Sequence, residues 1–426
     1  MLALVLRALL LWALCGSAAA AADLRGHGGP VRAIALSPDG ETIATASFDS
    51  TLILWSARTG AAKSVLRFHT GVVNAVIALP DGRFASAGED GRIALWRAGQ
   101  GMPDLVLSGH AGPIAGLAVS RDGAMLGSAS WDGTARLWPL AGGRAQVLAE
   151  HRGNVNGIGF LADGGVVTAG YDGTLRQFAP GGRLVRKLDL GAPLNSLLVD
   201  GEDGLIIAGG DGTVRFVDRA WQTPSGLAVS STPLVALALA PDGRRLAVAG
   251  FRGALALIAR GSMQIERRLE GPAFPLWSLA FSADGREILT GGADKLVRRW
   301  SVESGEPVSP VLAGPEEDIP ADLRNHPGAV VFRACGACHT LSRDGGNRAG
   351  PSLAGLYGRT IGTAPGYDYS PALRQLGIVW SKETVQRLFE SGPATYTPGT
   401  KMPEQTIARA EDRAALAEFL ELAGVR

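Results

Sequence analysis

The stretch Val31-Arg32-Ala33-Ile34-Ala35-Leu36-Ser37-Pro38-Asp39-Gly40 begins a unit that recurs seven times along the chain. Its apolar segment ends at an Asp-Gly pair, which is a signal for a β-hairpin because glycine accepts a positive φ. The glycines of the seven equivalent pairs are Gly40, Gly82, Gly123, Gly164, Gly204, Gly243 and Gly285. Internal periodicity of this length indicates a repeat architecture.

A second turn follows each hairpin. Its leading residue recurs at intervals of 39 to 42 residues, as Asp49, Asp90, Asp132, Asp172, Asp211, Arg252 and Asp294. Six positions later stands an apolar residue, which is Trp55, Trp96, Trp138, Phe178, Val217, Ile258 or Trp300. Each unit therefore predicts several short strands joined by tight turns. A small sheet of this kind cannot bury both of its faces alone, whereas seven sheets packed around an axis bury one another.

This pattern resembles the WD-repeat family, and the resemblance covers residues 23–302. It implies an all-β, seven-bladed WD-type propeller as the first folded domain of a multidomain chain. Two units match the family's His–Ser–Asp–Trp hydrogen-bond network, with His27, Ser47, Asp49 and Trp55, and with His110, Ser130, Asp132 and Trp138. His69 and His151 keep the histidine position without a complete network. We interpret these side chains as structural groups that satisfy buried turns.

Aromatic residues are concentrated at one position of the repeat. Four of the seven residues directly before the second turn are aromatic, although only 6% of the chain is aromatic; they are Phe48, Trp131, Tyr171 and Phe251. The resemblance places them on the rim of one face. It places a second set around the mouth of the central channel on that face, including Arg32, Asn74, Asn156, Asn195 and Trp277. Exposed aromatic side chains on one face are typical of an interface, so these nine residues are the candidate partner face. Packing of the rings against neighbouring blades is the alternative.

The composition limits the class of protein. A chain of 426 residues suggests two or three domains. Hydrophobic residues make up 46% and charged residues 19%, which excludes a mainly disordered chain. The net charge of +1 gives no bulk attraction to nucleic acid, so no nucleic-acid partner is expected. The three cysteines, Cys15, Cys335 and Cys338, are too few for a disulfide scaffold or a cluster held by four thiolates.

Residues 1–22 predict an export signal peptide, because an apolar core is followed by small residues that end in the run Ala18 to Ala22. A retained membrane anchor and a lipoprotein site at Cys15 are the alternatives. With cleavage near Ala20 or Ala22, we expect a periplasmic protein of a Gram-negative bacterium. The remaining chain has no apolar run of ~18 residues, so no membrane span is expected after cleavage.

Residues 303–325 predict an acidic, proline-containing linker. Val311 and Leu312 within it have the character of an outer strand for the last blade. Because the linker is short, the domain that follows, residues 326–426, is expected to lie close to the propeller.

This last domain begins with Cys335-Gly336-Ala337-Cys338-His339, and Cys-x-x-Cys-His is the attachment signature of c-type haem. Both thiols add to the vinyl groups of the porphyrin, and the adjacent histidine then reaches the iron from one face. A disulfide and a thioredoxin-like redox pair are the alternative uses of two cysteines at this spacing. The immediate histidine argues against both, and we expect one c-type haem with its iron.

The sequence after this motif contains, in order, Gly350-Pro351-Ser352-Leu353, Gly358-Arg359, Ala364-Pro365-Gly366-Tyr367, Tyr369-Ser370, Trp380 and Pro398-Gly399-Thr400-Lys401-Met402. These motifs resemble class I cytochrome c of the mitochondrial and purple-bacterial type, which implies a small all-α domain. The resemblance implies Met402 as the second axial ligand of the iron, opposite His339. It makes the Pro351 carbonyl the acceptor for the ring N–H of His339. It assigns Arg359, Tyr369, Trp380 and Thr400 to the haem environment.

The two resemblances together imply a periplasmic carrier of one electron whose propeller docks a redox partner protein. This function favours an electron-transfer protein over an enzyme. Two alternatives remain at this stage. The propeller of a periplasmic oxidoreductase would bind a small substrate and pass its electrons to the haem. A non-catalytic, redox-sensing scaffold would bind partners according to the state of the haem.

Overall fold

The computed structural model describes residues 23–201, 203–221, 225–271, 274–308, 319–332, 335–336, 338–342, 347, 350–367, 369, 371–398, 400, 402 and 406–424. The predicted export signal lies outside the described residues. Within these ranges, no helix combines the length and the apolar character needed to cross a membrane.

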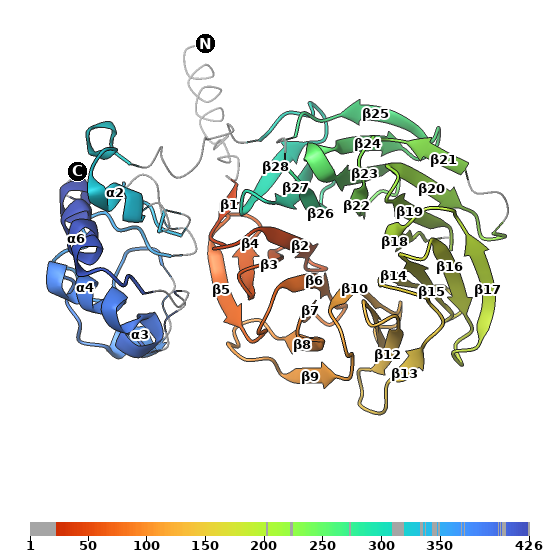
Figure 1. Ribbon diagram of the computed structural model, residues 1–426, viewed down its shortest axis with the longest axis horizontal. Coiled ribbons are helices and arrows are strands. Elements are labelled where there is room, and N and C mark those ends of the chain that lie inside the picture. Colours follow the sequence, from red (N-terminus) through yellow and green to blue (C-terminus); the bar gives the residue numbers. More distant parts are fainter. Residues whose placement is uncertain are drawn as a thin grey trace, which may run out of the picture.

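Seven four-stranded antiparallel sheets are arranged as blades around a central axis (Figure 1). Blade 1 consists of β2 (Val31–Leu36), β3 (Thr42–Ser47), β4 (Thr51–Ser56) and β5 (Ala62–Arg67), and blade 2 of β6 (Val73–Ala78), β7 (Phe84–Gly88), β8 (Arg92–Trp96) and β9 (Leu105–Ser108). Blade 3 consists of β10 (Ile114–Val119), β11 (Met125–Ser130), β12 (Ala135–Pro139) and β13 (Gln146–Leu148), and blade 4 of β14 (Val155–Phe160), β15 (Val166–Gly170), β16 (Thr174–Phe178) and β17 (Leu184–Asp189).

Blades 5 to 7 consist of β18 (Leu194–Val199), β19 (Leu205–Gly209), β20 (Thr213–Val217) and β21 (Ser225–Ala228); β22 (Leu234–Leu239), β23 (Arg245–Gly250), β24 (Leu255–Ala259) and β25 (Gln264–Arg268); β26 (Leu276–Phe281), β27 (Glu287–Gly292), β28 (Leu296–Ser301) and β1 (Leu24–Arg25). A short 3-10 turn, η1 (Phe251–Gly253), lies in blade 6. The predicted seven-bladed propeller is therefore confirmed.

The ring is closed by the first strand of the chain. In β1, Leu24 pairs with Val297 and Arg25 pairs with Leu296 of β28, so the amino-terminal segment supplies the outer strand of blade 7. The predicted outer strand at Val311 and Leu312 lies outside the described residues. Farther along the same edge of β28, Pro307 forms an isolated bridge with Trp300.

Burial between neighbouring blades holds the ring together. All five residues of each of the second strands β7, β15 and β19 are buried. Such strands are buried on both faces, as central strands between two apolar layers must be. The apolar clusters run across blade boundaries, so that residues of β4 in blade 1 and β8 in blade 2 share one cluster. Each blade is thus stabilised by its two neighbours.

In blade 1 the prediction of Ser47 as the hydroxyl of the His–Ser–Asp–Trp network is wrong, because Thr45 occupies that place. Thr45 Oγ1 lies 2.7 Å from His27 Nε2 and accepts a hydrogen bond from Trp55 Nε1 at 2.8 Å. His27 Nδ1 lies 3.1 Å from the carboxylate of Asp49, as expected. Ser47 instead donates to the carbonyl of Gly29 at 3.1 Å.

Strand register explains this difference. Trp55 pairs directly with Ile43 on β3, so its indole nitrogen reaches the diagonal neighbour on the same face, which is Thr45. Ser47 stands one pleat farther, at the end of the strand, where it serves the turn. Blade 3 shows the same correction, with Ser128 rather than Ser130 between the histidine and the tryptophan.

Blade 2 completes a network that the sequence left incomplete. His69 Nε2 lies 2.9 Å from Ser86 Oγ, which accepts from Trp96 Nε1 at 2.8 Å. In blade 4 the network stays partial, as expected. His151 contacts Thr168 at 2.7 Å, but Phe178 has no indole nitrogen to offer.

Six of the seven predicted Asp-Gly hairpins have their glycine at a positive φ, between 68° and 83°. In blade 5 this conformation moves to Asp203, with φ 64°, because the turn begins at Asp200 and the Asp203 N–H donates to its carbonyl at 3.2 Å. The hairpin of blade 5 is therefore shifted by one residue against the others.

The carboxyl-terminal domain is a small helical module beside the propeller (Figure 1). It contains η3 (Ala321–Leu323), α2 (Pro327–Phe332), α3 (Pro371–Gln375), α4 (Lys382–Ser391), α5 (Pro393–Tyr396) and α6 (Ala410–Gly424). Gly328 on α2 lies directly against the backbone of Ala415 on α6, where a side chain would collide. This close crossing brings the rings of Phe332 and Phe419 to a centroid distance of 5.3 Å. Ile319 and Leu323 pack into the same core.

Removal of one network carboxylate should destabilise the propeller. In Asp132→Ala, His110 Nδ1 and the Ala111 N–H lose their acceptor, which lies 2.8 Å and 3.0 Å away. We expect the free energy of unfolding, measured with urea, to fall by about 2 kcal/mol. Asp122→Ala, in the exposed hairpin of the same blade, should cost clearly less, because water can replace the hydrogen bonds lost there. Equal losses for the two variants would contradict the role of the network.

The same network predicts acid sensitivity. Burial raises the pKa of Asp132, but hydrogen bonds from Thr134 and His110 outweigh it and hold this pKa at about 2, while burial lowers the pKa of His110. Below about pH 6.5, His110 binds a proton more readily in the unfolded chain than in the folded one. Between about pH 4 and pH 2 the same holds for Asp132. Stability should fall on acidification through both windows.

Urea denaturation at pH 7, 5 and 3 measures this dependence. Asp132→Asn should flatten the loss below pH 4, because the amide does not titrate. A propeller that gains stability between pH 7 and pH 3 would refute the assignment.

Candidate functional site

The two cysteines of the carboxyl-terminal domain follow α2 directly. The Cys335 N–H donates to the Phe332 carbonyl at 2.7 Å, and the N–H groups of Cys338 and His339 donate to the Cys335 carbonyl at 3.0 Å. The motif thus forms a tight, helix-like turn that keeps both thiols and the imidazole on one short segment. Cys335 is buried, and burial raises the pKa of its thiol to about 12, so the thiol is protonated at neutral pH.

The imidazole of His339 has a fixed orientation. Its Nδ1 lies 2.7 Å from the carbonyl oxygen of Pro351. Because a carbonyl only accepts, Nδ1 carries the hydrogen, and the lone pair of the ring is on Nε2, the tautomer that a metal-ligating histidine needs. Gly350 lies so close to the ring that a Cβ there would overlap it. The structure thus brings His339 and Pro351 together as the sequence resemblance implied.

Met402 packs against the apolar cluster that contains Cys335, so the thioether and the first thiol share one core. The Met402 N–H donates to Thr400 Oγ1 at 3.0 Å, which fixes the backbone just before the methionine. Leu388 of α4 is buried in the same cluster and presents no hydroxyl near the sulfur. Met402 thus brings a soft, neutral thioether to the edge of the apolar core that contains Cys335.

The other three residues predicted for this environment lie in one region. The Trp380 side chain packs against the same cluster, and the backbone N–H of Trp380 donates to the Arg359 carbonyl at 3.0 Å. The Arg359 guanidinium donates to the carbonyls of Ser352 at 2.8 Å and Ala354 at 3.1 Å. It therefore braces the loop that follows Pro351. Burial raises the pKa of the Tyr369 hydroxyl, and the nearby charge of Arg359 opposes this rise.

Sequence reasoning missed two residues that support this pocket. Asn347 donates to the Pro365 carbonyl at 2.9 Å and accepts from the Ser352 N–H at 2.8 Å, so it joins the two loops. Tyr357 donates from its hydroxyl to the Ala417 carbonyl at 2.6 Å and ties the loop to α6. Neither residue stands in one of the motifs above, and the Pro365 and Ala417 carbonyls that they bind lie 18 and 60 residues away in sequence.

The cysteine motif also touches the propeller. Cys338 Sγ lies 2.9 Å from the carbonyl oxygen of Gly26, which directly follows β1, and Cys338 packs against an apolar cluster of blades 1 and 7. The segment that closes the ring thus contacts the segment that carries the thiols.

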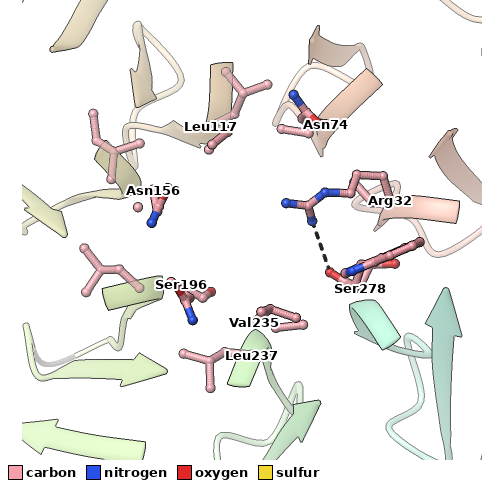
Figure 2. Close-up of a pocket in the computed structure, with 18 of the residues that line it drawn as sticks. Arg32, Asn74, Leu117, Asn156, Ser196, Val235, Leu237 and Ser278 are labelled. Carbon is pink, nitrogen blue, oxygen red and sulfur yellow. Dashed lines mark hydrogen bonds between the residues drawn. The ribbon is translucent and has the colours of Figure 1, made fainter. Parts of the chain in front are cut away.

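The candidate partner face converges on the centre of the propeller. Eight of its nine residues line one cavity of about 600 Å³: Arg32, Asn74, Trp131, Asn156, Tyr171, Asn195, Phe251 and Trp277. Figure 2 shows this cavity enclosed by the inner strands of the blades. The ninth residue, Phe48, stacks on Trp277 with a centroid distance of 5.0 Å. Trp131 Nε1 donates to Asn156 Oδ1 at 3.0 Å, which joins the aromatic rim to the channel wall.

The aromatic rim is partly exposed. Phe48, Trp131, Tyr171 and Phe251 expose between 38% and 58% of their surface. The alternative, packing of the rings against neighbouring blades, holds in part, because Phe48 of blade 1 stacks on Trp277 of blade 7 and Trp131 of blade 3 bonds to Asn156 of blade 4. The partner face stays a prediction.

The residues of the helical module fit a haem held through thioether bonds. Two thiols, an imidazole oriented by a carbonyl, and a thioether in the adjoining apolar core are the donor types that c-type haem uses. By class, the chain is a propeller joined to a c-type cytochrome.

Comparison with known proteins agrees with this class. The cytochrome c family matches residues 326–423, and the WD domain, G-beta repeat family matches residues 20–56, 60–97, 101–139, 142–178 and 263–301. Cytochrome c of Gibberella zeae is 43% identical over 95 residues, which cover 89% of that protein and 22% of this chain. Cytochrome c of Arabidopsis thaliana is 43% identical over 84% of its length and 22% of this chain, and cytochrome c 2.1 of Caenorhabditis elegans is 40% identical over 93% of its length and 25% of this chain.

Through its carboxyl-terminal domain, the chain belongs to the cytochrome c family. Its cofactor is a c-type haem with iron, which makes this domain an electron carrier, and its WD repeats make the propeller a domain for protein interaction.

The contact between Gly350 and His339 gives a test of the site. In Gly350→Ala the added methyl group overlaps the imidazole, so the ring must turn away from Pro351. After expression with a haem-maturation system, we expect roughly tenfold less low-spin protein, measured by absorbance spectroscopy. Gly377→Ala is the matched control, because a Cβ there meets nothing within 4 Å. An unchanged spectrum in Gly350→Ala would show that the ring orientation is set elsewhere.

Proposed function

We propose that this protein is a periplasmic one-electron carrier, with haem attached to Cys335 and Cys338, iron ligated by His339 and Met402, and a propeller that docks the redox partner protein. The observation that carries the proposal is the fixed His339 imidazole, whose Nδ1–H donates to the Pro351 carbonyl and thereby sets the tautomer in which Nε2 carries the lone pair. The haem supplies reversible exchange of one electron between ferric and ferrous iron.

The protein groups around the cofactor favour transfer without bond chemistry. Held by the His339 imidazole and the Met402 thioether, a haem iron would have no ligand position for a substrate. A soft sulfur ligand stabilises the ferrous state and raises the reduction potential. Arg359 braces the loop that follows Pro351 through the carbonyls of Ser352 and Ala354, and the Trp380 backbone N–H holds Arg359 in turn.

The docking role rests on the aromatic rim. Exposed Trp, Tyr and Phe side chains are enriched at the centres of protein interfaces. The cytochrome module has only two lysines, Lys382 and Lys401, so dense lysine steering toward an acidic partner is missing. A tethered docking domain offsets this, because it raises the effective concentration of the partner near the haem.

The periplasmic location is supported by the amino-terminal sequence, because residues 1–22 have the order of an export signal. Immunoblots of periplasmic and membrane fractions, with amino-terminal sequencing of the mature chain, test it. A mature chain that begins at Met1 would contradict export with signal cleavage.

Replacement of Met402 tests the axial ligand. The wild-type ferric protein should be low-spin and show a sulfur-to-iron absorption band. Met402→Ala should lose this band and lower the reduction potential, because the iron loses its soft ligand. The variant Met102→Ala, which removes an exposed methionine of the propeller, should change neither property. A high-spin wild-type spectrum would refute the carrier assignment.

Replacement of rim residues tests docking. Cross-linking of the haem-loaded protein in periplasmic extract should capture a redox protein, and Trp131→Ala with Tyr171→Ala should reduce capture at least about tenfold, as expected for hot-spot residues. Met263→Ala removes an exposed apolar side chain elsewhere on the propeller and serves as the control. Equal capture by all three proteins would place the docking surface elsewhere.

A further inference from the structure

Among the described residues that line the central channel of the propeller, one side chain is charged. The inner strands surround a cavity of about 600 Å³, and among the described residues that line it Arg32 is the only charged one. Figure 2 shows the Arg32 guanidinium projecting from β2 toward the centre of the channel. The other lining residues are apolar, aromatic or neutral and polar.

Arg32 has little compensation for its charge. Its described hydrogen bond runs from Nη1 to the Trp277 carbonyl at 3.5 Å, the weak end of the range for such bonds. No described carboxylate forms an ion pair with it, whereas Arg92, Arg176 and Arg215 of the same repeats each pair with an aspartate. Burial lowers the pKa of the guanidinium, which nonetheless stays charged at neutral pH. A cation in such surroundings is costly unless an anion joins it.

A second donor lies on the neighbouring blade. Asn74 occupies the same position of β6 that Arg32 occupies on β2, and it is only 6% exposed. Its amide nitrogen has no hydrogen-bond acceptor among the described residues. Figure 2 shows Asn74 and Arg32 on adjacent walls of the channel.

The equivalent asparagines of other blades have a structural use that Asn74 lacks. Asn156 Nδ2 donates to the Leu194 carbonyl at 2.9 Å, and Asn195 Nδ2 donates to the Leu234 carbonyl at 2.9 Å. Each of them ties one inner strand to the next. Asn74 forms no such tie among the described residues, so its amide and the Arg32 guanidinium are left as two adjacent donors in one cavity.

We propose that this channel binds a small monoanionic organic carboxylate, with Arg32 and Asn74 holding the carboxylate group and the apolar and aromatic walls covering the remainder. One guanidinium balances one negative charge, and its planar donor fork matches the two oxygens of a carboxylate. The cavity volume lies within the range of ~300–1,000 Å³ of ordinary small-molecule sites. Trp277 and Tyr171 are the aromatic residues of this wall that flank the Arg32 and Asn156 positions of the repeat.

Binding of a small carboxylate within the channel requires neither a redox partner nor the haem, so this proposal and the docking proposal can fail separately. The two surfaces share residues, because Trp131 and Tyr171 of the proposed docking rim also line this cavity.

Calorimetric titration of the haem-loaded full chain with benzoate tests the proposal. Benzamide is the neutral probe of the same shape, and sulfate is the inorganic anion. We expect benzoate to bind at least about tenfold more tightly than either, because only benzoate offers both one charge and an apolar body. Undetectable binding of benzoate, or equal binding of benzamide, would overturn the proposal, and tighter binding of sulfate would overturn the assignment to a carboxylate.

Variants locate the binding. Arg32→Gln should weaken benzoate binding about 10- to 100-fold, as the loss of a charge-assisted pair predicts. Arg58→Gln, which removes an exposed arginine between β4 and β5, should leave it unchanged. Benzoate binding that survives in Arg32→Gln would overturn the site.

Thermal unfolding without ligand separates a binding role from a structural one. Because Arg32 lacks a described counter-ion, Arg32→Gln should keep or raise the Tm of the propeller, and circular dichroism should show an unchanged fold. A Tm lower by several degrees, or failure to fold, would make Arg32 a structural residue and would equally overturn the proposal.

Discussion

Each blade of this propeller depends on its neighbours, because a four-stranded sheet with two apolar faces has no way to cover itself. The second strands make this plain, since β7, β15 and β19 are buried at every position. A ring of such blades leaves no exposed apolar face only when the last blade meets the first. The strand β1 has only two residues, but closure of the ring depends on it, because it completes blade 7 by pairing with β28.

The same geometry explains the channel. Seven inner strands in equivalent positions bring seven equivalent side chains to one mouth, so a single repeat position becomes a ring of contacts. Whether a member of that ring is structural depends on where its polar atoms find partners. Asn156 and Asn195 each reach a carbonyl of the next inner strand, whereas Asn74 has no described acceptor and Arg32 has one weak bond. The repeated positions therefore form the wall of the channel, and Arg32 and Asn74, which lack the inter-strand bond of the asparagines, are the candidates for binding a ligand.

The sequence predicted those features that depend on local spacing. The Asp-Gly hairpins, the recurring tryptophans and the Cys-x-x-Cys-His motif all follow from residues a few positions apart. The features that it missed depend on register or on distant contacts. The network hydroxyl is Thr45 because Trp55 pairs with Ile43, which spacing along one strand does not reveal. In the same way, Asn347 and Tyr357 support the haem site through partners 18 and 60 residues away.

The contact between Cys338 and Gly26 joins the two domains at an informative place. Leu24 and Arg25 close the ring, and Gly26 follows them directly, so the residues that lock the propeller also meet the turn that carries the haem thiols. A cytochrome on a free tether would sample many orientations. Here the turn contacts the segment that closes the propeller ring, and His339 is the next residue in the chain after Cys338. The imidazole therefore has a fixed position relative to the propeller, which also carries the aromatic rim. A docking domain needs such an arrangement if it is to present a partner to the haem repeatedly in one geometry.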